Sequence, residues 1–133
     1  MKKIITKSKI VQLLIGCKII TLFGLIHAKK SSMCQKDINH EVTHVEQWQE
    51  LTIAGYAVVT PFVLFGINWL LLLPPFIFYL WYVLEWLVRL TQKGNAYKNI
   101  CFEQEAYQNE TDDNYNENRD YFSFIKYLKN KKL

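Results

Sequence analysis

A run of 21 residues without a charged side chain, residues 53–73, constrains this chain more than any other feature. A second apolar run at residues 76–90 is interrupted by only two charged residues. A helix needs about 20 apolar residues to cross a bilayer, so the first run is long enough and the second is marginal. Pro74-Pro75 cannot continue a regular helix, and therefore marks a turn or a kink between the runs. We predict a transmembrane helical hairpin over residues 51–90.

A fully buried core helix is the alternative explanation, but a single domain of 133 residues has little other material to cover it. Charge also favours a membrane. Residues 1–40 contain eight Lys and one Asp, and Arg89, Lys93 and Lys98 flank the end of the second run. Because cytoplasmic flanks are rich in Lys and Arg, we expect both ends of the hairpin on the cytoplasmic face of the cell inner membrane. The basic residues belong to no nucleic-acid-binding motif, so we expect no nucleic-acid partner.

Two interpretations compete for the N-terminal segment. Basic residues 1–9 followed by Leu14-Ile15-Gly16-Cys17 loosely resemble a lipoprotein signal, although the apolar stretch is short for one. The β-branched content favours instead a β-hairpin over residues 10–28, with strands at residues 10–15 and 19–28. Its turn is predicted at Gly16-Cys17-Lys18.

Residues 40–44 read His-Glu-Val-Thr-His, in a helix predicted over residues 37–50 with Asp37 as its N-cap. On a helix His40 and His44 lie one turn apart on one face, so both imidazoles can bind one Zn²⁺. Glu41 lies beside them, where a carboxylate can accept a proton from a metal-bound water. Gln47 extends the same face by one more turn. A solvated helix with incidental histidines is the alternative.

A catalytic zinc site usually has three protein ligands, so one more is needed. A helix predicted over residues 95–110 places Glu103, Tyr107 and Glu110 on one face. We predict Glu103 as the third ligand, with Glu105 as the fallback and a solvated acidic helix as the alternative. A single membrane crossing would separate Glu103 from the two histidines. A hairpin returns the chain to the same side, so the hairpin and the zinc site support each other.

The motif His-Glu-x-x-His-x-x-Gln, followed by Phe-Glu-x-Glu-Ala from Phe102, resembles zinc peptidases of the gluzincin type. These include HtpX-type proteases and CAAX prenyl endopeptidases, in which a Glu of an E-x-x-A-D motif completes the zinc site. The resemblance implies that His40, His44 and Glu103 are zinc ligands and that Glu41 is the general base. Tyr107 stands where that motif has Asp. Tyr107, Gln47 and Glu105 are therefore candidates for packing against the ligands or hydrogen-bonding to them.

A closer resemblance is to a family of short uncharacterised bacterial membrane proteins, and it covers roughly residues 19–128. That family has no established activity, so the resemblance strengthens the motif without naming a substrate. The matching segments are Asn39-His-Glu-x-x-His-x-x-Gln47, Phe78-Tyr-Leu-Trp-Tyr82, Glu85-Trp-Leu87 and Phe102-Glu-x-Glu-Ala-Tyr-x-Asn-Glu110.

We therefore expect a mainly α membrane protein forming one zincin-like domain over residues 1–133. Its function would be that of a zinc metallopeptidase acting on a peptide or membrane-protein substrate at the lipid bilayer. Glu41 would take a proton from the zinc-activated water and pass it to the leaving amine. The alternatives are a non-catalytic membrane protein with a structural or sensory zinc site, and a metal-free membrane adaptor. The basic amphipathic tail over residues 121–133 would either lie on an anionic membrane or pack over the ligand helix.

Overall fold

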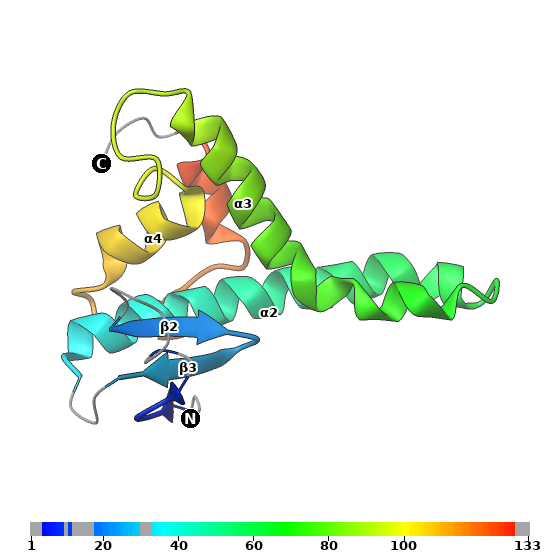
Figure 1. The fold of residues 1–133 in the computed structure, drawn as a ribbon, viewed down its shortest axis with the longest axis horizontal. Coiled ribbons are helices and arrows are strands. Elements are labelled where there is room, and N and C mark those ends of the chain that lie inside the picture. The colour runs from blue at the N-terminus through cyan, green and yellow to red at the C-terminus, as the bar shows by residue number, and fades with distance from the viewer. Residues whose placement is uncertain (1–3, 10, 12–17, 30–32, 130–133) are drawn as a thin grey trace.

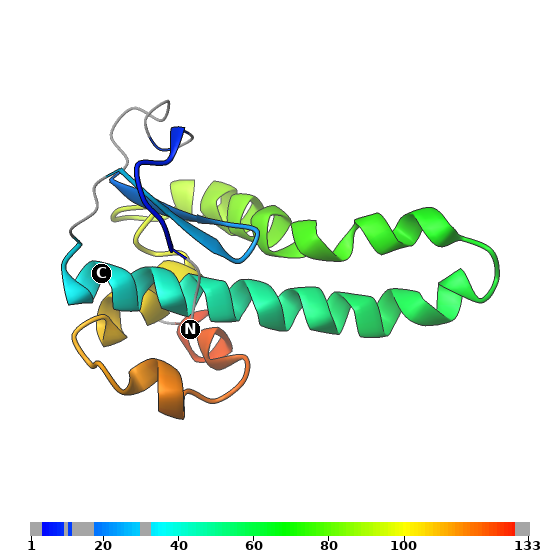
Figure 2. The ribbon, with the colours of Figure 1, turned by 90° about the horizontal axis from the view of Figure 1, so that it is seen from below.

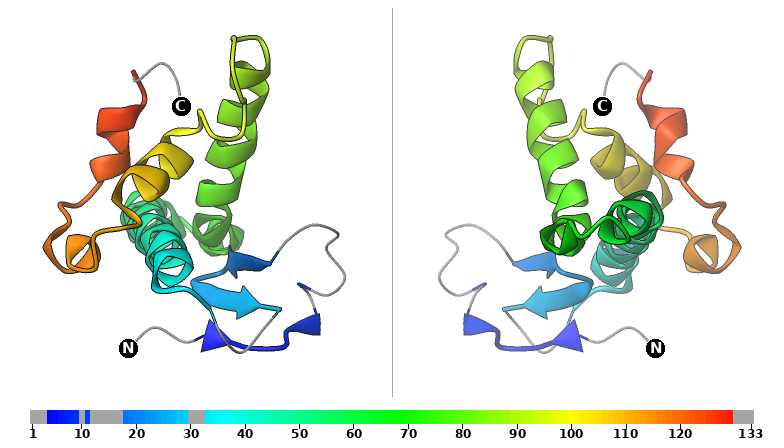
Figure 3. Two further views of the ribbon diagram at one scale, coloured as in Figure 1. Left: turned by 90° about the vertical axis from the view of Figure 1, so that its left-hand side faces the viewer. Right: turned by 90° about the vertical axis from the view of Figure 1, so that its right-hand side faces the viewer.

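The computed structural model describes residues 4–9, 11, 18–29 and 33–129. These residues are mostly helical, as predicted, and a small sheet lies beside the longest helix (Figure 1). Seen end-on, that helix has the sheet on one side and the later helices on the other (Figure 3). The helical elements are α2 (Gln35–Val63), η1 (Asn68–Leu72), η2 (Pro74–Phe76), α3 (Ile77–Leu90), α4 (Cys101–Asn109), α5 (Tyr115–Asn118) and η3 (Ser123–Tyr127).

The sheet has the strand order β1–β3–β2, with β1 at Ile4–Ile5, β2 at Ile19–Leu22 and β3 at Leu25–Ala28. The single strand predicted over residues 19–28 is wrong, because the chain folds back within it as an antiparallel hairpin. Phe23 and Gly24 form the turn with φ of +49° and +71°, as a two-residue type I′ turn requires. The strand predicted at residues 10–15 and the Gly16-Cys17 turn fall almost entirely outside the described residues.

Helix α2 has 29 residues and is about 43 Å long at 1.5 Å per residue. Its N-terminal half carries the His-Glu-x-x-His motif, and its C-terminal half is the first arm of the apolar hairpin. The N-cap predicted at Asp37 is wrong. The helix begins at Gln35 after an extended Cys34, and Asp37 lies in the first turn, where a negative charge favours the positive end of the helix dipole.

The apolar segment does form a hairpin, whose two arms lie side by side (Figure 2). Its tip is at Gly66 and not at Pro74-Pro75, because Gly66 has a φ of +87° that other residues rarely adopt. Pro74 instead begins η2, since proline fits the first turn of a helical segment. The tip divides the 21-residue run at residues 53–73. Within the described part of the chain, only Asn68–Leu90 is long and apolar enough to cross a membrane, so a pair of spans is not confirmed.

The two charged residues of α3 point into the protein. Glu85 and Arg89 form an ion pair at 2.8 Å, with side chains 8% and 7% exposed. Glu85 Oε1 also accepts the backbone N–H of Cys101 at 3.0 Å, which ties the start of α4 to α3. The ligand helix predicted from residue 95 therefore begins later, at Cys101. Gly94, with a φ of +112°, and an Asn95 side chain that accepts the Lys98 N–H form turns before it.

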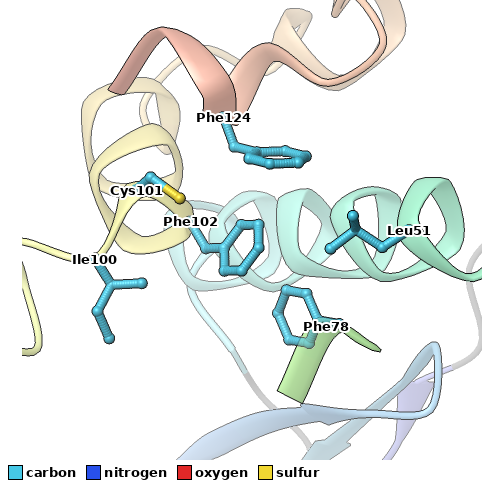
Figure 4. Packing of buried hydrophobic residues seen from close by; sticks show 6 residues of the cluster. All are labelled: Leu51, Phe78, Ile100, Cys101, Phe102 and Phe124. Atoms are coloured by element: carbon cyan, nitrogen blue, oxygen red, sulfur yellow. The ribbon is translucent and has the colours of Figure 1, made fainter. Parts of the chain in front are cut away.

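The hydrophobic core lies where α2, α3, α4 and η3 meet. Figure 4 shows Phe102 of α4 between Phe78 of α3 and Phe124 of η3. Phe102 and Phe124 are almost fully buried, and their ring centroids are 4.8 Å apart. The tail over residues 121–133 was expected either to lie on a membrane or to pack over the ligand helix. In its described part, Phe124 packs in the core against α4, which favours the second outcome. This core fixes α4 against α2, which is what the site requires.

Candidate metal centre

His40 and His44 lie one turn apart on α2, and Glu103 reaches them from the first turn of α4. Their ligand atoms all lie within 4.8 Å of one another. The Nε2 atoms of the two histidines are 3.2 Å apart. Glu103 Oε2 is 3.4 Å from His40 Nε2, and Glu103 Oε1 is 3.2 Å from His44 Nε2. This group, brought together from two helices 60 residues apart, is almost completely buried and can hold a metal ion.

Hydrogen bonds at Nδ1 orient the Nε2 atoms of both imidazoles towards each other and towards Glu103. His40 Nδ1–H donates to Glu110 Oε2 at 3.1 Å, and His44 Nδ1–H donates to Gln47 Oε1 at 2.8 Å. The Gln47 amide nitrogen donates to the Phe102 carbonyl, which leaves its oxygen as the acceptor. When the rings are neutral, both Nε2 atoms therefore direct lone pairs at each other and at the Glu103 carboxylate. A proton on one of the rings or a metal ion between them removes this repulsion.

The separations fit a tetrahedral metal ion. Ligands that lie 2.0–2.1 Å from a tetrahedral zinc are about 3.3 Å apart. The distance between the two Nε2 atoms matches this value, and so does the distance from each Nε2 to one of the two Glu103 oxygens. Glu103 Oε2 is also buried and finds no hydrogen-bond partner in the described part of the chain. Such an atom is costly unless something binds it, and a metal ion is the partner that this donor set suits.

The partners of the ligands continue outward as ordered networks. Glu110, which accepts from His40, pairs with Lys36 at 2.9 Å. A carboxylate on the second nitrogen of a ligating histidine fixes the ring and increases its basicity. Tyr82 of α3 donates to Glu103 Oε1 at 2.8 Å and so fixes the third ligand. Tyr107 packs against the His40 ring with centroids 4.6 Å apart, which is the packing role considered above.

Glu105, the fallback ligand, is not at the centre. Two residues after Glu103 a helix has turned about 200°, so Glu105 points to the opposite side of α4. There it accepts hydrogen bonds from Gln47, Tyr115 and Arg119. Arg119 also pairs with Glu50, and the side chains of all three charged residues are at most 5% exposed. Glu105 thus supports the site indirectly, through Gln47 and then His44.

Glu41 is beside the ligands but not among them. Its Oε2 accepts a hydrogen bond from Thr21 of β2 at 2.7 Å. It lines two neighbouring cavities of about 340 and 320 Å³, which also share Ile19 and Tyr97. The first is lined mainly by apolar and aromatic side chains together with His44 and Glu103, and the second mainly by polar ones. A carboxylate is thus held between open space and the metal-binding group.

Some of these residues were not predicted. Helical spacing placed Glu110 on the same face as Glu103. The same spacing could therefore have suggested that Glu110 lies near the histidines, where it accepts a hydrogen bond from His40. Thr21, Tyr82 and Tyr97 lie far from the motif in sequence, and no spacing rule connects them to it. Tyr97 comes from the segment before α4, where burial and the charge of Glu103 raise the pKa of its phenol and keep it protonated. His27, by contrast, is buried in β3, where its Nδ1 is hydrogen-bonded to Ser8 Oγ at 3.0 Å.

We expect metal binding to release a proton from His44. Burial lowers the pKa of its imidazole, but the charge of Glu103 outweighs burial and raises the pKa to about 9. Near neutral pH the His44 imidazole of the metal-free protein is therefore protonated, and this proton must leave before the metal binds. The affinity for zinc should accordingly rise about tenfold per pH unit between about pH 7 and 8. Calorimetry in buffers of different ionisation enthalpy measures the protons released. Binding enthalpies that do not change with the buffer would contradict this.

Comparisons with family models, with curated protein sequences and with solved structures found no match for this chain. The family resemblance described above therefore stays a prediction, and the site rests on its own geometry.

Proposed function

We propose that this protein is a zinc metallopeptidase that works at a membrane surface. The observation that carries the proposal is the Glu41 carboxylate, held by Thr21 at the wall of a cleft beside a His-His-Glu group. Two imidazoles and one carboxylate at these separations suit Zn²⁺. Three protein ligands leave the fourth position of a tetrahedral ion open, as in catalytic zinc sites, whereas structural sites are usually closed by a fourth.

The residues around the cleft have separate roles in this proposal. Bound zinc would supply a Lewis acid and make a bound water acidic near neutral pH. Glu41 would accept the proton of the attacking water and return it to the leaving amine. Thr21 holds the Glu41 carboxylate in position. Tyr97, whose phenol stays protonated, lines both cavities and would donate a hydrogen bond to the substrate carbonyl.

The outer edge of β2, which pairs with no strand in the described part of the chain, supports a peptide as the substrate. β2 is the edge strand of the sheet, and Ile19 and Thr21 line the cavity that contains Glu41. Leu22 and Leu25 flank the two-residue turn, so the hydrogen-bonded pairs alternate from there. The backbone N–H and C=O groups of Ile19 and Thr21 therefore point away from β3. An extended peptide can pair with them as an added strand.

The membrane part of the proposal rests on the surface of α3. Its two charged residues are buried, whereas Leu80, Leu84 and Val88 are 61%, 54% and 58% exposed. This is the reverse of a helix on the surface of a soluble protein, and it suits lipid. The basic flanking residues favour the cytoplasmic face for the site.

The metal content of the purified protein tests the site. We expect one zinc per chain in the wild type and its loss in both His44→Ala and Glu103→Ala. Glu117→Ala, which removes an exposed acid from α5, is the matched control and should keep the metal. Circular dichroism of each variant would show that the fold is retained. Zinc that survives both ligand substitutions would refute the site, and zinc without hydrolysis would favour a structural or sensory role.

A further inference from the structure

The apolar side chains at the tip of the hairpin are strongly exposed. Leu64 and Phe65 are each 83% exposed, and Trp69 is 62% exposed. Between Pro61 and Phe78 the only polar side chain is that of Asn68. A hairpin that crossed a bilayer would place its tip among the opposite headgroups and in water, where polar residues are expected. This tip has the composition of a segment that ends inside hydrocarbon.

The length of the hairpin leads to the same conclusion. Exposed apolar residues begin at Ile53, and the chain reverses at Gly66. Thirteen residues rise at most about 20 Å as a helix, whereas the hydrocarbon of a bilayer is about 30 Å thick. The arm is therefore too short to reach the far side from its base. It reaches deeper than the roughly 15 Å of one leaflet only if its tilt from the membrane normal is less than about 40°.

The second arm does not continue straight into α3. The chain bends near η2, and α3 leaves the axis of the hairpin to pack on the core (Figure 1). Asn68–Leu90 has the length of a span, but in space it is two segments that point in different directions. Prolines at the start of a helical segment, together with the packing of Phe78 in the core, explain the bend.

The outer face of α3 fits the membrane interface. An open groove of about 570 Å³ runs along α3. Its lining is mostly apolar and includes Leu80, Leu84, Val88 and Leu128, together with the paired Glu85 and Arg89 and with Gln92. Lys93 and Lys129, both exposed, directly follow in sequence the lining residues Gln92 and Leu128. An apolar groove with lysines at one end is complementary to an acyl chain and an anionic headgroup.

We infer that residues 53–76 insert into the hydrocarbon from one face of the membrane and return to that face without crossing, while α3 lies along the interface. The occupant of this apolar surface is lipid. The protein is then anchored in the membrane but does not span it, and its metal-binding group remains on the side from which the hairpin entered. The inference does not require peptidase activity.

Spin labels on the full-length protein test this insertion. Cys17 and Cys34 are changed to Ser, and the buried Cys101 is kept. A label is then attached at Phe65→Cys or Leu72→Cys in the hairpin, and at Tyr121→Cys as the control. Phe65 and Tyr121 are 83% and 84% exposed, so the labels differ in location and not in packing. The protein is reconstituted in vesicles of phosphatidylcholine and phosphatidylglycerol.

We expect the labels at residues 65 and 72 to collide with oxygen but not with a water-soluble nickel chelate, at a depth of about 10–20 Å. The label at residue 121 should show the opposite. A membrane-impermeant maleimide should not react with unlabelled Phe65→Cys from either side of the vesicle. Reaction from the side opposite the protein would mean that the hairpin spans, and would overturn the inference. Spin–spin broadening with low oxygen accessibility would overturn it in favour of a second copy, and exposure to the chelate at all three positions would exclude insertion.

Discussion

Glu41→Gln is expected to lower kcat/KM for peptide hydrolysis by about 10²–10⁴-fold while the protein keeps its zinc. Gln has the size of Glu and can still accept the Thr21 hydrogen bond, but it cannot take a proton from water. Glu41 is not one of the three grouped ligands, so metal binding should be unchanged. The measurement pairs elemental analysis with the release of labelled fragments from denatured casein by the protein in detergent micelles.

The control for this experiment is Glu117→Gln, which makes the same chemical change at an exposed position of α5. Its activity and metal content should match those of the wild type. Full activity in Glu41→Gln would show that Glu41 is not the general base. Loss of zinc together with activity would instead place Glu41 among the ligands. The two failures are distinguished by the metal measurement.

Arg119→Met is expected to lower the free energy of unfolding by about 3–5 kcal/mol, because it leaves two carboxylates buried without their cation. Arg119 binds both Glu50 and Glu105, and all three side chains are at most 5% exposed. The same change should weaken zinc binding about tenfold or more, since Glu105 accepts from Gln47 and Gln47 from His44. Thermal or denaturant unfolding in micelles measures the first effect and competition with a chelator the second.

Lys126→Met is the matched control for Arg119→Met, because it also removes one positive charge from the C-terminal segment. Lys126 pairs with Asp120, but both side chains are exposed, at 67% and 81%. Exposed ion pairs contribute about 0–1 kcal/mol, so the stability should hardly change. Adding Glu50→Gln to Arg119→Met should restore part of the lost stability. Equal stability of the two single variants would show that the Arg119 cluster does not hold the C-terminal segment to α2.

The fold could be predicted from the sequence where one residue pattern repeats along an element. The apolar run predicts helix over much of residues 51–90, and the structure has helical segments there. The turn could not be placed, because Pro74-Pro75 is the stronger local signal and Gly66 reverses the chain. Proline only excludes conformations, and it can begin a helical segment as easily as end one. Where the chain turns also depends on how the two arms pack, and Gly55 of α2 lies close to Pro74 of the second arm.

The candidate site divides in the same way. The i, i+4 spacing places His40 and His44 on one face of any helix. The i, i+7 spacing likewise places Glu103 of α4 and Glu110, its C-cap residue, on one side. The rule does not say that these two faces meet. Glu103 and Glu105 are both glutamates of the same helix, so the sequence does not distinguish them as ligands. The orientation of α4 directs Glu103 to the histidines and Glu105 to Arg119.

By itself, the sequence determined what is local: a helix with two imidazoles one turn apart, a carboxylate beside them and a charge-free segment that follows. The tertiary structure decided what those groups meet. It placed α4 against α2 by burying Phe102 between Phe78 and Phe124, and that packing brings Glu103 within 3.4 Å of both histidines. The reason is physical: backbone geometry sets spacing within one helix, whereas contact between helices depends on how their side chains fill a shared core.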